Sequence, residues 1–236
     1  MTATPIVVRS TTSVLVVDDH TTFSDLLAMA LAREPDFTCV GTAPDVATAL
    51  AMADELRPDL VLMDVRLGDG DGIVATAELT RLYPELRVVV LTAHIDTALM
   101  QRAAEAGACG LLPKDGSLPD MLQALRSSRR GGMVVHPALL TALLTSRSLR
   151  RGSDSFPPLT RREHEVLRML ADGSDARAIA MHLGISMNTC RGYVKSLLLK
   201  LGAHSQLEAV VIATNHGLVN VGPRAVPGGG NHNQER

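Results

Sequence analysis

The sequence predicts an α/β domain with a doubly wound, five-stranded parallel sheet, followed by an all-α domain of four helices. Up to about residue 130, short apolar runs alternate with segments whose apolar residues recur at helical spacing, which is typical of repeated βα units. From Leu159 onward the spacing is purely helical. The charge divides in the same way, because residues 1–125 hold 8 Lys+Arg and 18 Asp+Glu whereas the remainder holds 15 and 7. The resulting net charges of −10 and +8 favour an acidic module joined to one that binds a polyanion.

The first domain is expected to contain five βα units. Short apolar runs separated by helical segments indicate strands that are buried on both faces of a parallel sheet. In the first helical segment Phe23, Leu26, Leu27 and Leu31 share one face, and Pro35 ends it. The expected strands are 14–17, 38–41, 60–63, 88–91 and 110–112, and the expected helices are 22–33, 44–56, 72–82, 96–106 and 117–130.

The second domain is expected to follow a linker. Gly131 and Gly132 interrupt the pattern, a connecting helix could form at 137–144, and the polar stretch that ends in Pro157 and Pro158 indicates exposed chain. Glycines at the intervening turns suit the C-caps of the four helices expected at 161–171, 175–183, 187–201 and 205–216. The expected division is a disordered extension at 1–12, a first domain at 13–130, a linker at 131–157, a second domain at 158–219 and a disordered tail at 220–236.

Cysteine usage and hydropathy predict a soluble cytoplasmic protein. Cys39, Cys109 and Cys190 are isolated at spacings that suit neither a disulfide framework nor a zinc site. No apolar stretch approaches the roughly 20 residues of a membrane span, and the first residues lack the pattern of a signal peptide. We therefore expect no membrane partner.

Four of the five expected strands lead into residues that are capable of chemistry. Asp18 and Asp19 follow the first strand, Asp64 the third and Thr92 the fourth, while Lys114 comes shortly after the fifth. Sites in open α/β sheets lie beyond the carboxyl ends of the strands. Converging carboxylates need a cation, and an oxygen-only site suits Mg²⁺. Asp64 is then a candidate nucleophile for a phosphoryl group, although each residue taken singly could cap a helix or carry a solvated charge.

Residues 13 to about 130 resemble a response-regulator receiver domain, which has a flavodoxin-like fold, through the stretches VLVVDDH, LVLMDVRLGDGDG, VVVLTA and GACGLLPKD. The resemblance implies that Asp64 accepts a phosphoryl group from a sensor histidine kinase. It also implies that Thr92 and Lys114 contact this group and that Leu111 occupies a switch position. The implied Mg²⁺ ligands are Asp18, Asp19, Asp64 and the backbone carbonyl of Arg66.

Two positions depart from the receiver pattern. Gly68 stands where the family usually has proline, which is expected to loosen the loop after Asp64. Leu111 stands where the family usually has Tyr or Phe, a ring that moves with the threonine on activation. Acceptance of phosphate is therefore easier to predict than its structural consequence.

The basic second domain is expected to form a helix-turn-helix, whose second helix enters the DNA major groove. An ordinary amphipathic helix with a solvated basic face is the alternative. The stretches LTRREHEVLRMLADG, AIAMHLGIS and NTCRGYVKSLLLKLGAHSQLEAV resemble the LuxR-type DNA-binding domain. The candidate DNA-binding residues are Ser186, which is also the expected N-cap, Asn188, Thr189, Arg191, Gly192, Tyr193 and Lys195. By the same resemblance Ala209, Val210, Ile212 and Ala213 pack between two subunits on DNA, and the alternative is that this helix is only a wall of the domain core.

Together the two halves resemble NarL/FixJ-type two-component response regulators. This implies a homodimeric transcription factor, not an enzyme, with double-stranded DNA and a sensor histidine kinase as partners and RNA polymerase as a further candidate. One alternative is a phosphorylation-independent transcription factor that uses its receiver for dimerisation or partner binding. Another is a phosphotransfer enzyme of the aspartyl-phosphate type, which Arg66 disfavours because it stands where a second acid would be needed.

Overall fold

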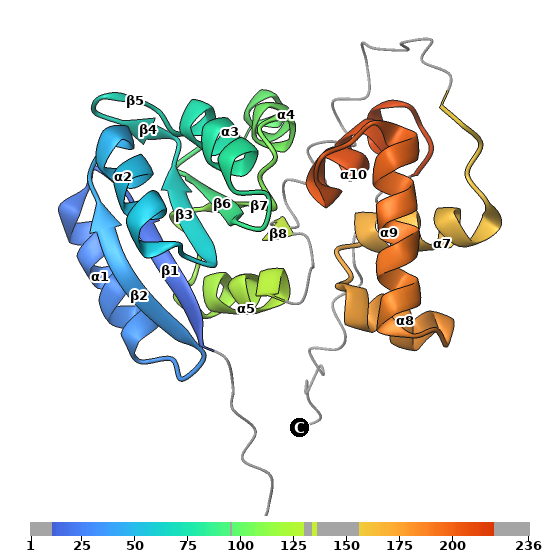
Figure 1. The fold of residues 1–236 in the computed structure, drawn as a ribbon, viewed down its shortest axis with the longest axis horizontal. Helices are drawn as coiled ribbons and strands as arrows, with labels where there is room; N and C mark the ends of the chain where they lie inside the picture. The colour runs from blue at the N-terminus through green and yellow to red at the C-terminus, as the bar shows by residue number, and fades with distance from the viewer. Residues whose placement is uncertain (1–10, 95, 130–133, 136–155, 220–236) are drawn as a thin grey trace, which may run out of the picture.

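The computed structural model describes residues 11–94, 96–129, 134–135 and 156–219. It contains an α/β domain and a helical domain (Figure 1). The parallel sheet has the strand order β2-β1-β3-β6-β7-β8. Its strands are β1 (Thr12–Val17), β2 (Phe37–Ala43), β3 (Leu60–Asp64), β6 (Arg87–Thr92), β7 (Gly110–Pro113) and β8 (Val134–Val135).

Helices cover both faces of the sheet because alternate residues of each strand point to opposite sides. Val14 and Val16 face the side covered by α1 and α5, whereas Leu15 and Val17 face the side covered by α2 and α3. All four are fully buried. The helices of this domain are α1 (Thr21–Ala32), α2 (Val46–Leu56), α3 (Gly72–Leu82), α4 (Thr97–Glu105) and α5 (Leu118–Arg129).

The predicted fold class is confirmed, with two additions that periodicity did not reveal. A sixth, short strand, β8, pairs with β7 at the sheet edge. The loop after Asp64 forms a small antiparallel hairpin of β4 (Arg66–Leu67) and β5 (Gly70–Asp71). Strands of two residues are too short to show an alternating pattern.

Several expected boundaries shift by one or two residues. Asp45 and Asp96 precede their helices as N-caps, and each accepts a backbone N–H of the first turn. Thr12 already belongs to β1, where it pairs with Phe37, rather than to the expected extension. Most of that extension, the connecting helix at 137–144 and the tail at 220–236 lie outside the described residues.

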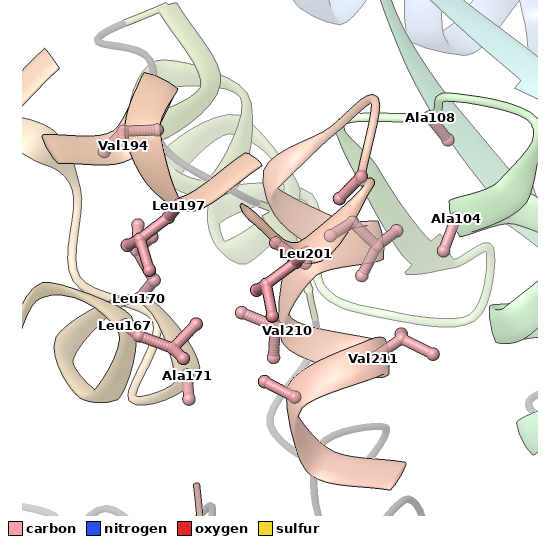
Figure 2. Packing of buried hydrophobic residues seen from close by; sticks show 14 of the residues in the cluster. Ala104, Ala108, Leu167, Leu170, Ala171, Val194, Leu197, Leu201, Val210 and Val211 are labelled. Carbon is pink, nitrogen blue, oxygen red and sulfur yellow. The ribbon is translucent and has the colours of Figure 1, made fainter. Parts of the chain in front are cut away.

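The helical domain contains α7 (Arg161–Ala171), α8 (Ala176–Leu183), α9 (Met187–Leu201) and α10 (Gln206–Asn215). Gly184 and Gly202 end α8 and α9 at a φ of 65°, a left-handed conformation that glycine adopts without a steric penalty. Leu167 and Leu170 of α7 pack with Leu197 of α9 in the core of this domain (Figure 2). No helix among the described residues is long and apolar enough to cross a membrane.

The two domains meet where α10 packs against α4. The apolar residues of α10 are spread around the helix, so both of its sides must pack against other apolar surfaces to be buried. Val210 points towards Leu201 and the core of its own domain, whereas Val211 lies on the side of Ala104 and Ala108 (Figure 2). The receiver-like domain therefore supplies part of the apolar cover of α10.

Candidate functional site

The carboxyl edge of the sheet gathers two buried carboxylates around one ammonium group. Asp18 follows β1 and is 1% exposed, while Asp64 ends β3 and is 4% exposed. The Nζ atom of Lys114 lies 2.8 Å from Asp18 Oδ2 and 2.7 Å from Asp64 Oδ2. The backbone N–H of Lys114 donates to the carbonyl of Thr92 at 2.8 Å, which fixes the loop that carries the ammonium. The carboxyl ends of β1, β3 and β7 thus bring these three side chains together, with β6 between β3 and β7.

Burial and neighbouring charges have opposite effects on the pKa values of the residues in this cluster. Burial raises the pKa of Asp64, and it outweighs the hydrogen bond and the charge of Lys114, which act to lower that pKa. Burial also acts to lower the pKa of Lys114, but the hydrogen bonds and charges of Asp18 and Asp64 together raise it. The ammonium therefore stays protonated and compensates only part of the cost of burying two carboxylates.

The residues of this edge fit a divalent cation. Ligand atoms of Asp18, Asp19, His20 and Asp64 all lie within 4.8 Å of one another. Asp18 Oδ2 is buried, and its one partner among the described residues is the Lys114 ammonium at 2.8 Å. Such an oxygen is available as a ligand for a hard cation such as Mg²⁺. Arg66, whose backbone carbonyl was an expected ligand, is in β4 and lines the adjoining cavity.

His20 was not among the residues expected from the sequence. Its Nδ1 atom lies 2.9 Å from Asp19 Oδ1, and its backbone N–H donates to Asp18 Oδ1 at 2.9 Å. Its position immediately after the two aspartates was the available sequence signal. The side chain is largely exposed, so it lies at the rim of the carboxylate cluster.

Thr92 and Leu111 make other contacts in this structure. Thr92 Oγ1 donates to the carbonyl of His94 at 2.6 Å and accepts the backbone N–H of His94 at 3.1 Å. The hydroxyl is therefore bound within its own loop. Leu111 is fully buried in the apolar cluster that contains Met100 and Ala103 of α4.

The loop after Asp64, in which Gly68 stands, forms a hairpin that is tied to the start of α2. The hairpin of β4 and β5 spans this loop, and Asp69 accepts the backbone N–H groups of Val46 and Ala47 at the start of α2. Gly72 lies directly against the phosphoacceptor candidate, because a Cβ atom at this position would be 1.8 Å from the carbonyl oxygen of Asp64. The acidic, glycine-rich sequence is thus a structural support for the site.

A cavity of about 690 Å³ opens beside Asp64. Its lining combines Asp64, Thr92 and Lys114 with Asp71 from β5 and Arg102 from α4. Asp71 caps α3 by accepting the N–H of Ile73 at 2.8 Å, and its second oxygen forms an ion pair with Arg102. The helix α4 is thereby linked to the loop of the acidic site, a link that the sequence analysis did not anticipate.

The helix α9 presents a polar face that the receiver-like domain leaves uncovered. Its predicted N-cap is observed, since Ser186 Oγ accepts the N–H of Thr189 at 3.1 Å. Asn188, Gly192 and Lys195 lie at helical spacing along one exposed stripe. Of the other candidate DNA-binding residues, Ser186, Thr189 and Arg191 are exposed, and Tyr193 is partly buried. Leu199 continues the stripe at 78% exposure and was not predicted.

A buried acid joins α9 to the rest of its domain. Glu163 forms a capping box with Thr160, accepts the hydroxyl of Ser196 at 2.6 Å, and pairs with Lys200 at 2.7 Å. Burial acts to raise the pKa of Glu163, but these hydrogen bonds and the lysine lower it to about 2. The T-x-x-E spacing before an apolar run is the sequence signal for the capping box, whereas the contacts with α9 depend on the tertiary fold.

The fold and these two surfaces define a DNA-binding response regulator, in which an acidic α/β receiver is joined to a helix-turn-helix domain. The family model of the response regulator receiver domain matches residues 14–126, and that of the bacterial regulatory proteins of the luxR family matches residues 157–213. The chain belongs to the NarL/LuxR-type response regulators of two-component systems.

Individual relatives agree with this assignment. The response regulator protein VraR of Staphylococcus aureus (strain NCTC 8325 / PS 47) is 32% identical over 209 residues, which cover 89% of this chain and 99% of VraR. A LuxR-family two-component response regulator from Aurantimonas sp. SI85-9A1 has a similar crystal structure at 28% identity and a TM-score of 0.56, covering 59% of this chain and 100% of that one. The RcsB response regulator of Salmonella typhimurium, at 24% identity and a TM-score of 0.56, shares the fold over 85% of this chain and 97% of its own.

Proposed function

We propose that Asp64 accepts a phosphoryl group from a sensor histidine kinase and that this event controls the pairing of two DNA-binding domains through α10. The observation that carries the proposal is the position of Asp64, which lies at the sheet edge with Lys114 at 2.7 Å and opens onto the cavity. In the transfer, the phosphorus–nitrogen bond of the donor breaks as a phosphorus–oxygen bond to Asp64 forms. The Lys114 ammonium stabilises the negative charge on the transferred oxygens.

Asp18, Asp19, Asp64 and the backbone carbonyl of Arg66 would hold Mg²⁺ for this reaction. When bound, the ion supplies charge neutralisation between the carboxylates and the phosphoryl oxygens. The geometry of the carboxylates supports this assignment, because their oxygens lie within 4.8 Å of one another at the sheet edge. Without added positive charge, Lys114 alone would face two carboxylates and a phosphoryl group.

The Thr92 hydroxyl can hydrogen-bond either within its own loop or to a phosphoryl group on Asp64. The hydroxyl now donates to the carbonyl of His94 and accepts the N–H of His94, so donating to a phosphoryl group on Asp64 requires that the hydrogen bond to the His94 carbonyl break. The loop so released leads within a few residues to Asp96, the N-cap of α4. A phosphoryl group carries about −1.5 to −2 charges at neutral pH and can bias such a two-state element.

If α4 moves, the apolar side of α10 that now packs on α4 becomes free to pack on another surface. In the observed arrangement α4 packs on α10, and the side of α10 towards Ala104 carries Val211 (Figure 2). A second copy of α10 cannot occupy the same side while α4 is there. We therefore assign the closed arrangement to the resting protein and expect release of α10 to permit a dimer in which Ile212, which is only partly buried, gains apolar cover. Ala209, Val210 and Ala213 are already fully buried, and Val210 points into its own core.

The DNA contacts are assigned to α9. Its exposed stripe carries Asn188, Gly192 and Lys195, with Thr189 and Arg191 beside it, and its N-terminus can meet a phosphate. A dimer doubles the number of phosphate contacts, so DNA affinity should fall steeply with salt concentration. RNA polymerase as a further partner stays a prediction.

A phosphorylation-independent regulator is the second candidate function. Leu111 favours it, because this buried aliphatic side chain cannot provide the moving aromatic ring of the receiver pattern. In that case the receiver would act only as the cover of α10 or as a docking module.

Intact-mass spectrometry after incubation with Mg²⁺ and acetyl phosphate distinguishes the two functions, with sedimentation velocity on the same samples. We expect wild type to gain one phosphoryl group and to shift towards dimer, and Asp64→Asn to do neither. Absence of uptake by wild type, with a competent receiver labelled in parallel, would instead support the phosphorylation-independent regulator.

A further inference from the structure

Arg102 lies at the acidic site, and the residues that follow it in the same turn of α4 lie at the domain interface. Its guanidinium forms an ion pair with Asp71, and both side chains line the cavity beside Asp64. The two side chains are 50% and 39% exposed, so the pair is open to solvent and can rearrange. Arg102 is therefore a half-exposed cation held next to the place where the phosphoryl group would form.

Asp71 is held close to the phosphoacceptor by the backbone. It directly precedes Gly72, whose N–H donates to the carbonyl of Val65 at 2.9 Å and whose Cα lies against the carbonyl of Asp64. A guanidinium that rests on Asp71 therefore already lies at the cavity beside Asp64. The hairpin backbone can stay in place when the guanidinium turns further into this cavity, so the displacement falls on α4.

The neighbouring residues on α4 belong to the domain interface. Ala103 and Ala104 are fully buried in the apolar cluster that also contains Val211 of α10, and Figure 2 shows Ala104 on the side of the cluster nearest to Val211. One short helix thus carries a cation at the acidic site and small apolar residues at the interface. A displacement of the cation would be transmitted to the interface because the helix is rigid over this length.

We propose that Arg102 is the positioning residue that couples phosphorylation to domain release, by exchanging Asp71 for the phosphoryl oxygens on Asp64. This inference rests on the proposed phosphorylation of Asp64. A phosphoryl group offers more charge than a half-exposed carboxylate and three acceptor oxygens for the planar guanidinium fork. The exchange pulls α4 towards the acidic site and away from α10. Phosphorylation and domain release can thus be coupled without an aromatic side chain at position 111, where this chain has Leu111.

Two substitutions that break the same ion pair separate this role from a purely structural one. Arg102→Gln removes the cation, whereas Asp71→Asn removes its resting partner and keeps a good N-cap for α3. If the ion pair only holds α4 in place, both variants should behave alike. If Arg102 moves to the phosphoryl group, Asp71→Asn should respond to phosphorylation and Arg102→Gln should not. Arg57→Gln is the matched control, since it breaks an exposed Arg–Asp pair at the end of α2, at the opposite edge of the sheet.

The experiment measures the dimer association constant of the full chain by sedimentation velocity, with and without acetyl phosphate and Mg²⁺. Intact mass gives the phosphoryl occupancy, so that variants are compared at equal occupancy. We expect phosphorylation to raise the constant at least tenfold in wild type, Arg57→Gln and Asp71→Asn. In Arg102→Gln the phosphorylated and unphosphorylated constants should agree within twofold.

A tenfold response that survives in Arg102→Gln overturns the inference and leaves the phosphorylation of Asp64 intact. Equal loss of the response in Arg102→Gln and Asp71→Asn also overturns it, because the ion pair would then be structural. Absence of phosphoryl uptake by wild type overturns the inference and the proposed function together, and the mass spectrum alone identifies that case.

Discussion

Lys114 Nζ lies 2.7 Å from Asp64 Oδ2 and 2.8 Å from Asp18 Oδ2, so one ammonium serves two buried carboxylates. This shared cation leaves an excess of negative charge at the sheet edge of the unmodified protein. The same excess that suits a cation and a phosphoryl-transfer site destabilises the fold. The excess negative charge therefore favours cation binding and phosphoryl transfer but lowers the free energy of unfolding. This loss of stability can be measured.

Replacing Asp64 with Asn is expected to stabilise the protein at neutral pH. Burial holds the pKa of Asp64 above its unfolded value, so the folded state keeps the proton at pH values where the unfolded state has lost it. The destabilising contribution is absent below the unfolded pKa of 3.8 and grows as the pH rises through the folded pKa. We expect Asp64→Asn to raise the free energy of unfolding at pH 7 by about 1 kcal/mol. Urea titrations at pH 7 and pH 3.5 should show this gain and its disappearance, and a loss of stability at pH 7 would contradict the argument.

Gly72→Ala is expected to disrupt the acidic site, whereas Gly68→Ala is not. A Cβ at Gly72 would lie 1.8 Å from the Asp64 carbonyl oxygen, whereas nothing lies within 4 Å of one at Gly68. We expect Gly72→Ala to cost about 2–4 kcal/mol of stability and to slow phosphoryl uptake at least tenfold. Gly68→Ala should change stability by less than about 0.5 kcal/mol. Thermal denaturation and intact mass test both variants, and equal behaviour of the two would refute the close contact.

Glu163→Gln is expected to weaken the helical domain at neutral pH. The folded pKa of Glu163 is about 2 against an ordinary 4.5, so its stabilising contribution is fully present above pH 4.5 and is lost as the pH falls towards 2. At pH 7 the substitution should cost on the order of 1–3 kcal/mol, because Lys200 loses its buried partner. Urea unfolding followed by circular dichroism at several pH values should show the difference between variant and wild type shrinking below pH 4.5. A difference that is constant across this range would contradict the assignment.

Lys195→Ala is expected to weaken DNA binding without altering the fold, because this side chain is exposed on the stripe of α9. Loss of one phosphate contact should reduce the slope of log affinity against log salt by about 1. Fluorescence anisotropy with a labelled generic duplex over a salt series measures this slope. Arg161→Ala is the control, since Arg161 is 94% exposed and belongs to α7 rather than to α9. An equal loss in both variants would indicate only a general charge effect.

Local pattern predicted the helices most accurately. The limits expected for α3, α7 and α9 agree with the structure, because each has a long apolar stripe or a clear cap such as Asp71, Thr160 or Ser186. The five expected strands of the parallel sheet were also predictable from their buried runs, whereas the two-residue β8 was not. The hairpin at Arg66–Asp71 was not, because pairing in so short a segment is decided by the neighbouring α2 and α3.

The sequence by itself determined the two-part architecture and the residue types at the end of each strand, since periodicity, caps and charge are local properties of the chain. Only the tertiary structure decided that Lys114 serves two carboxylates and that Arg102 rests on Asp71. It also decided that α4 covers α10. These contacts join residues whose partners are chosen by sheet order and helix packing, and no local pattern in one segment specifies which distant segment will lie against it.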